Sequence, residues 1–258
     1  MKMNKMISSV ALLAIAGNVL MAGGDIAPVE PVVPEVVVNN GWEYSASLNG
    51  WMASIGGDTA VGGDIDIGFS DIVDDLDFTI MGTLGAQKEK WGFLLDFIYL
   101  DIDSDMFEAT SNPLAYITNI ELEAWIVTPM VTYRIMEEEQ WTLDALAGAR
   151  YLYIKAPLEV DYVKLDSPSN DVWDGIVGAR GQYKIDEKWY MPFHFDVGTG
   201  DTDLTWQAFA GVGYKYESFD FVAGYRYLDW DFDDSDTGGG TFNDLTVDGP
   251  IIGAKFYF

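Results

Sequence analysis

The last ten residues, "GPIIGAKFYF" (249–258), alternate as an extended strand up to the final residue. Successive side chains of a strand point to opposite sides. The residues that share one face are Ile252, Ala254, Phe256 and Phe258. Chain ends usually fray, whereas this ending is regular and aromatic. It therefore predicts a terminal strand that is held by a partner strand elsewhere in the sequence.

The composition limits the class of protein. The 258 residues include no cysteine, which excludes disulfide bonds and thiolate metal sites. Acidic residues outnumber basic ones by 42 to 14, and the net charge of −28 argues against nucleic acid as a partner, because like charges repel. Disordered acidic chains contain few aromatics, but this chain has 14 Phe, 14 Tyr and 9 Trp. The charge therefore belongs to a folded protein.

The N-terminus predicts export. Lys2 and Lys5 precede an apolar run over residues 6–16, and small residues follow, which is the pattern of a secretory signal peptide over residues 1–22. The run is shorter than the roughly 20 apolar residues that a membrane-spanning helix needs. Residues 23–41 are rich in Pro and Val, and we expect them to form an extended periplasmic linker.

The rest of the sequence, residues 42–258, alternates with a period of two. In most of the alternating segments one set of side chains is wholly apolar or aromatic, and the opposite set is mixed. Ten such segments occur, at residues 42–54, 77–88, 90–103, 118–135, 140–155, 171–184, 188–199, 203–216, 219–231 and 245–258. All ten reach the roughly 9–11 residues that a tilted strand needs to cross a bilayer.

The connections between these segments distinguish a membrane barrel from a soluble sandwich. Four of them are tight ("QKEKW", "MEEEQW", "IDEKW" and "KYESF") and alternate with connections that are mostly long and acidic. Each tight turn brings an aromatic residue to the start of the next strand. This arrangement is typical of a transmembrane β-barrel, whose sheet must close because unpaired backbone groups are too costly in hydrocarbon. We predict an all-β, antiparallel up-and-down barrel of ten strands, with eight or twelve as alternatives, in which the terminal strand pairs with 42–54.

Two local features qualify this expectation. Pro129 interrupts the pattern of 118–135 and should mark a β-bulge, because proline has no amide hydrogen for the ladder. The connection over residues 55–76 suggests a small hairpin turning at Gly62–Gly63, followed by a helical turn that Ser70 would cap. This connection would either cover the barrel mouth as a lid or protrude without a chemical role.

At this point the chain resembles the Gram-negative outer-membrane β-barrel proteins. The resemblance rests on the signal peptide, the meander and the terminal Phe258 and Phe256. It implies an outer-membrane location, contact with lipid and lipopolysaccharide, and recognition of the terminal aromatics by the barrel-assembly machinery during biogenesis. The stretch "GFSDIVDDLDFTIMG" (68–82) is also similar to a signature of uncharacterised small barrels, and it names no activity. We expect a monomer.

An acidic connection is a candidate cation site. The segment "DWDFDDSDTGGG" carries five carboxylates, hard oxygen ligands that suit Ca²⁺ or Mg²⁺. These are Asp229, Asp231, Asp233, Asp234 and Asp236. The alternative is a solvated acidic rim with loosely held divalent ions, and we favour it. We predict no other cofactor.

The mixed faces of the strands place charges inside the barrel. The expected inward set is Arg150, Arg180, Arg226, Lys215, Lys255, Asp96, Glu123, Asp144, Asp174, Asp196 and Asp220. These charges would either form the constriction of a pore or pair with one another across a filled lumen. Bulky inward neighbours such as Leu94, Leu146 and Leu228 favour a filled lumen, because a ten-strand barrel leaves little interior space.

His194 and Asp196 share one face of a strand, and such a pair can act as acid and base. Their place midway along the strand favours instead a role in the hydrogen bonds of the lumen. We therefore predict a non-enzymatic structural or surface barrel. A narrow cation-favouring channel is the alternative, followed by a membrane-embedded hydrolase.

The resemblance generates a prediction about the terminal aromatic residue. Phe258→Asp should leave the protein degraded or aggregated in the periplasm, because a charge replaces the aromatic that assembly would recognise. Membrane fractionation with immunoblotting measures this, and Lys188→Asp in a tight turn is the matched control. Accumulation of Phe258→Asp in the outer membrane at the wild-type level would contradict the prediction.

Overall fold

The computed structural model describes residues 41–58, 64–69, 76–104, 117–155, 158–160, 163–165, 170–232 and 243–258. The predicted signal peptide and all of the predicted linker except its last residue lie outside these ranges. So do the predicted turn at Gly62–Gly63 and the helical turn from Ser70. Within the described residues, no helix is long and apolar enough to span a membrane.

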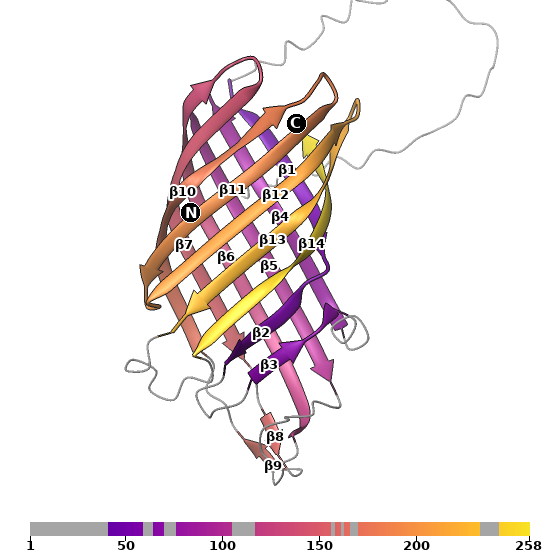
Figure 1. Cartoon of the computed structure of the whole chain (residues 1–258), viewed down its shortest axis with the longest axis vertical. Helices are drawn as coiled ribbons and strands as arrows, with labels where there is room; N and C mark the ends of the chain where they lie inside the picture. The colour runs from indigo at the N-terminus through magenta and orange to yellow at the C-terminus, as the bar shows by residue number, and fades with distance from the viewer. Residues whose placement is uncertain are drawn as a thin grey trace, which may run out of the picture. The chain divides into compact units, whose positions relative to one another are not determined.

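Ten antiparallel strands form a closed barrel (Figure 1). The barrel strands are β1 (Glu43–Trp51), β4 (Leu76–Lys88), β5 (Trp91–Ser104), β6 (Ile117–Glu137), β7 (Trp141–Lys155), β10 (Asn170–Lys184), β11 (Trp189–Gly200), β12 (Leu204–Lys215), β13 (Phe219–Asp231) and β14 (Asp244–Tyr257). Each pairs with its neighbour in chain order, so the predicted up-and-down topology and strand number are confirmed.

The barrel closes between its first and last strands. β14 pairs with β1 from Ser45 opposite Tyr257 to Trp51 opposite Ile251. Beyond the last pair of the ladder, the amide of Phe258 donates to the carbonyl of Tyr44 at 3.0 Å. The terminal strand therefore has the fixed partner that its regular alternation predicted.

In the described ranges, four short strands lie outside the ten-strand path. They are β2 (Ser54–Asp58), β3 (Asp64–Ile67), β8 (Leu158–Val160) and β9 (Val163–Leu165). β2 continues the line of β1 after a break at residues 52–53 and pairs with β14 in the same register. β3 pairs with the other edge of β2 and β9 with β8, forming two hairpins at the long-connection end of the barrel (Figure 1). The predicted segment 42–54 therefore combined β1 with the first residue of β2.

The outer surface of the barrel is apolar and carries two belts of aromatic pairs. Near the short turns, ring centroids lie 4.7–4.9 Å apart in the pairs Trp91–Tyr133, Trp141–Tyr183 and Trp189–Tyr214. Toward the long connections, the pairs Tyr99–Trp125, Tyr151–Trp173 and Trp206–Tyr227 have centroids 4.3–4.8 Å apart. Aromatic girdles flanking an apolar band match the two interfaces of a bilayer.

The expected bulge at Pro129 is absent from the described strand β6. Pro129 pairs with Leu95 of β5, and the β6–β7 ladder keeps one register on either side of Thr128 and Pro129. The missing amide is tolerated because the β6–β7 ladder simply omits these two residues. The register shift of the β6–β7 ladder lies instead between Arg134 and Met136, next to the short turn.

The short turn between β10 and β11 is held by one carboxylate. Asp186 Oδ1 accepts hydrogen bonds from the amides of Trp189 at 2.7 Å and Lys188 at 2.8 Å. These amides hold the pKa of the exposed Asp186 below its ordinary value, because they stabilise the charged form. The Asp186 carboxylate therefore accepts hydrogen bonds from two turn amides in place of backbone carbonyls.

We predict that Asp186→Ala loosens this turn in a pH-dependent way. Because the folded-state pKa is lowered, the two hydrogen bonds act fully above the ordinary Asp pKa of about 3.9 and are lost as pH falls through the lowered value. At pH 7 the amides of Lys188 and Trp189 should exchange hydrogen about fivefold faster than in the wild type, and the ratio should approach one in strong acid. Glu187→Ala is the matched control; equal effects of the two substitutions would refute the assignment.

Candidate functional site

The lumen is filled by side chains in three layers along its length. The layer nearest the long connections is apolar, and its buried residues are Trp51, Ala53, Ile55, Met81, Ile98, Ile126, Leu152, Ile154, Leu228, Trp230, Leu245, Val247 and Ile251. Leu228 and Trp230 have no exposed surface at all. These residues project inward because they occupy alternate positions of their strands. They close the barrel toward its long connections.

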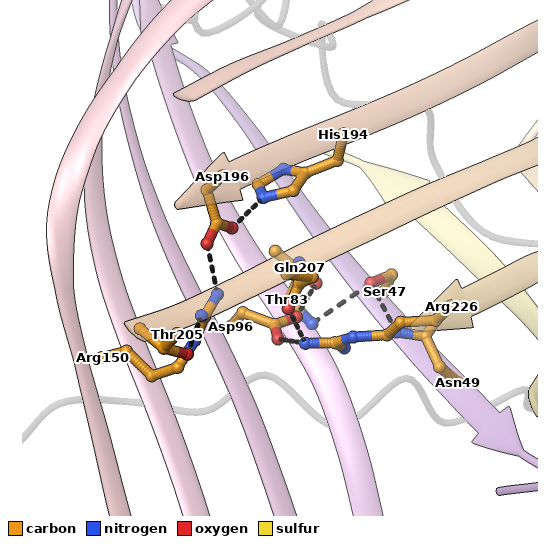
Figure 2. Close-up of polar contacts among 10 residues, drawn as sticks. All are labelled: Ser47, Asn49, Thr83, Asp96, Arg150, His194, Asp196, Thr205, Gln207 and Arg226. Carbon is orange, nitrogen blue, oxygen red and sulfur yellow. Dashed lines mark hydrogen bonds and ion pairs between the residues drawn. The ribbon is translucent and has the colours of Figure 1, made fainter. Parts of the chain in front are cut away.

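A first polar network crosses the middle of the lumen (Figure 2). Arg150 on β7 pairs with Asp196 on β11 at 2.6 Å, and both side chains are fully buried. The same guanidinium donates to Thr205 Oγ1 at 2.8 Å. His194 Nε2 lies 2.6 Å from the second oxygen of Asp196. Asp196 is thus bound on both oxygens, one by arginine and the other by histidine.

A second polar network lies beside the first (Figure 2). Arg226 on β13 donates to Asp96 on β5 at 2.7 Å and to Gln207 Oε1 at 2.7 Å. Asp96 also accepts from Thr83 Oγ1 at 2.8 Å. The Arg226 guanidinium lies over the Trp51 ring at 5.1 Å, which joins this network to the apolar layer.

The third layer lies at the short-turn end. Asp144 binds Arg134 Nε at 2.5 Å. Asp220 accepts hydrogen bonds from the hydroxyls of Tyr190 at 2.9 Å and Tyr257 at 2.7 Å. Arg134, Tyr190 and Tyr257 were not among the predicted inward residues. Arg134 lies on the same face of β6 as the buried Thr128 and Thr132. Strand alternation alone would have predicted this if no bulge had been expected at Pro129.

The remaining predicted lumen residues separate into three groups. Arg180, Lys215 and Lys255 face the lumen at the short-turn end, opposite inward residues of the neighbouring strands. Asp174 is buried and accepts the amide hydrogen of Thr202 at 3.0 Å. The prediction for Glu123 is wrong: it lies on the outer face, where the Trp125 indole donates to it. Unbroken alternation from the buried Ile126 fixes this orientation.

The proposed cation ligands are not brought together in the described part of the chain. Asp229 accepts a hydrogen bond from Thr246 Oγ1 at 2.6 Å. Asp231 is exposed at the end of β13. Asp233, Asp234 and Asp236 lie outside the described residues. No group of three or more potential metal-ligating side chains occurs among those described, so the cation site stays a prediction.

The His194–Asp196 pair offers one half of a hydrolytic site. Catalysis by such a pair requires a nucleophile or water within hydrogen-bond reach of the histidine. Across the described contacts, His194 binds Asp196 and no hydroxyl, while the nearby Thr205 binds Arg150 and the carbonyl of Asp229. The arrangement supports structural bonding within the lumen.

No protein-family model matches the chain, and no curated protein matches it. Solved structures of outer-membrane proteins align with the chain. The outer membrane protease OmpT of Escherichia coli is 11% identical with a TM-score of 0.49, and the alignment covers 84% of this chain and 97% of that one.

Two further solved structures align over a similar length. Neisserial surface protein A is 12% identical with a TM-score of 0.35, covering 84% of this chain and 97% of that one. Ail, the attachment invasion locus protein of Yersinia pestis, is 15% identical with a TM-score of 0.34, covering 84% and 99%.

The buried ion pair yields a prediction about stability. Arg150→Met should lower the free energy of unfolding by about 3–5 kcal/mol, because Asp196 then stays buried without its charged partner. Urea unfolding of the refolded protein in lipid vesicles measures the loss. The matched control is Arg134→Met, whose side chain is 20% exposed and whose removal should cost less. A smaller loss for Arg150→Met than for Arg134→Met would contradict the prediction.

Proposed function

We propose that the protein is an integral β-barrel of a bacterial outer membrane, exported by its N-terminal signal peptide. In this proposal it acts as a non-enzymatic structural or surface protein with a largely filled lumen. The packed lumen carries the proposal. Lipid, lipopolysaccharide and, during biogenesis, the barrel-assembly machinery are its proposed partners.

The polarity of the barrel supports the membrane location. Large apolar side chains such as Leu84, Val177 and Phe195 are about half exposed or more on its outside. Charged residues such as Arg150 and Asp196 are fully buried on its inside. A protein in water would expose this outer apolar surface at a high cost in free energy, whereas a bilayer covers it.

The apolar layer supports a closed barrel rather than a porin. Water and ions cross a lumen easily where polar groups line a continuous path. Here Leu228 and Trp230 fill the lumen beside the long connections with no exposed surface. On the short-turn side of these residues, the guanidinium groups of Arg150 and Arg226 occupy the lumen and are bound to acids of other strands.

The same contacts support a non-enzymatic role. Asp196 is bound by both Arg150 and His194, so the pair has little freedom to exchange partners during a reaction. The histidine also lies at mid-depth of a packed lumen, where a large substrate has no room. The function that remains is presented by the surface: the connections, the outer face and the rims.

A narrow cation-favouring channel is the second candidate. The net charge of −28 favours it, because an acidic mouth concentrates cations near any residual path. Such a path would have to pass between the side chains of the apolar layer. This candidate therefore predicts small and strongly cation-selective currents.

Single-channel recording decides between the two candidates. We expect the purified, refolded protein to give no conductance steps in a planar bilayer, because three layers of side chains fill the lumen. Small steps with strong cation selectivity would favour the channel instead. Leu228→Gly with Trp230→Gly removes two fully buried side chains of the apolar layer and should increase the conductance. Large, stable and weakly selective steps from the wild type would refute the filled lumen and favour a porin.

A further inference from the structure

Tyr257 and Phe258 extend beyond the ladder that joins β14 to β13, which reaches only the pair Phe219–Phe256. On the other side of β14, the ladder with β1 includes Tyr257, and the amide of Phe258 donates to the carbonyl of Tyr44 at 3.0 Å. In the described strand registers, the backbone of these two residues is therefore paired with β1 alone. A strand end that is paired on one side only opens easily.

The side chain of Tyr257 supplies a bond to the other side of β14. Its hydroxyl donates to Asp220 Oδ2 on β13 at 2.7 Å. The hydroxyl of Tyr190 on β11 donates to the same oxygen at 2.9 Å. Asp220 is only 3% exposed, so little water competes for its carboxylate, and hydrogen bonds to a carboxylate are stronger than those between neutral groups. One oxygen atom thereby joins β11, β13 and β14.

A glycine allows Tyr190 to reach across β12. Tyr190 lies opposite Gly213 of β12 in the strand register. A Cβ atom at Gly213 would collide with the phenol end of the Tyr190 ring. The ring therefore lies over the glycine backbone, and its hydroxyl reaches Asp220 one strand further along the wall.

Two lysines restrain the tyrosine rings. The ammonium group of Lys215 lies 5.4 Å from the ring centroid of Tyr190, and that of Lys255 lies 4.9 Å from the ring centroid of Tyr257. Both lysines lie opposite Asp220 in the strand registers. Attraction between an ammonium group and a ring face favours this arrangement of the rings, in which both hydroxyls meet the carboxylate.

The seam between β1 and β14 is reinforced differently at its two ends. Toward the long connections, the Trp51 indole of β1 donates to the carbonyl of Gly249 on β14 at 3.2 Å. At the short-turn end, the described contacts include no side-chain hydrogen bond from β1 to β14. The side-chain bond that holds this end of β14 is the one from Tyr257 to Asp220, on the β13 side.

We propose that Asp220, Tyr190 and Tyr257 form a latch that holds the end of β14 in the barrel wall and keeps the seam closed at the short-turn end. The latch concerns local opening of the barrel and goes beyond the proposed function. Without it, Tyr257 and Phe258 would leave the wall and expose part of the β1 edge. An exposed edge offers unpaired backbone groups to other chains and is unfavourable in a bilayer.

Hydrogen exchange of the refolded full chain in detergent, followed by NMR, tests the latch. In Tyr257→Phe the amide of Phe258 should exchange about tenfold faster than in the wild type, because one hydrogen bond to a charged group is lost. Tyr225→Phe is the matched control. Tyr225 also donates its hydroxyl to an aspartate across the β13–β14 pair, Asp248, but on the outer face, and this variant should leave the exchange of the Phe258 amide unchanged.

A second variant and a second set of amides separate the latch from a general loss of stability. Tyr190→Phe keeps the bond from Tyr257 and should accelerate exchange at Phe258 by a smaller factor than Tyr257→Phe does. In both variants the amides of β10 should exchange as in the wild type. Wild-type exchange at Phe258 in Tyr257→Phe, or equal acceleration at Phe258 and in β10, would overturn the proposal.

Discussion

The closure of the sheet is the constraint on which the rest of the structure depends. Pairing of β1 with β14 leaves no sheet edge along the seam, which is the condition for a sheet to exist in hydrocarbon. Closure also divides the side chains into two populations, because alternate residues of every strand must point into the lumen or out of it. The outer population became apolar and aromatic. The inner population had to fill a space too narrow for a second layer of backbone.

The side chains that fill this space differ in character at three depths of the lumen. Near the long connections apolar side chains seal it, and their burial is favourable without any specific geometry. In the middle, arginines and acids occupy the lumen as bound pairs. At the short-turn end, Asp144 binds Arg134 and Asp220 accepts the hydroxyls of Tyr190 and Tyr257. The apolar side chains that close the lumen and the charged side chains within it therefore lie at different depths.

Sequence alone predicted the elements that depend on local patterns. Period-two alternation located the ten strands. The tight turns such as "IDEKW" predicted which strand ends are joined by short connections. Contacts between distant strands were beyond it: Arg226 binds Asp96, 130 residues away, and no local pattern selects Asp96 among the inward acids. Glu123 was assigned to the wrong face, and the expected bulge at Pro129 is absent from the described β6. A single proline changes the backbone donors but leaves the alternation of a strand intact when a neighbouring ladder omits it.

The buried ion pairs contribute something that apolar side chains in their place would not. A well-packed apolar replacement for a buried ion pair often gives a more stable protein, so stability alone does not explain them. Backbone ladders join each strand to its two neighbours and leave the cross-section of a barrel free to flatten. Arg226 on β13 and Asp96 on β5 are separated by three strands along the wall, yet their side chains meet across the lumen at 2.7 Å. Such a directional bond fixes the distance between opposite walls, because charge-assisted hydrogen bonds have a narrow optimum of length and angle. We infer that the Arg226–Asp96 pair braces the barrel, and that the contact of the Arg226 guanidinium with the Trp51 ring connects this brace to the apolar layer.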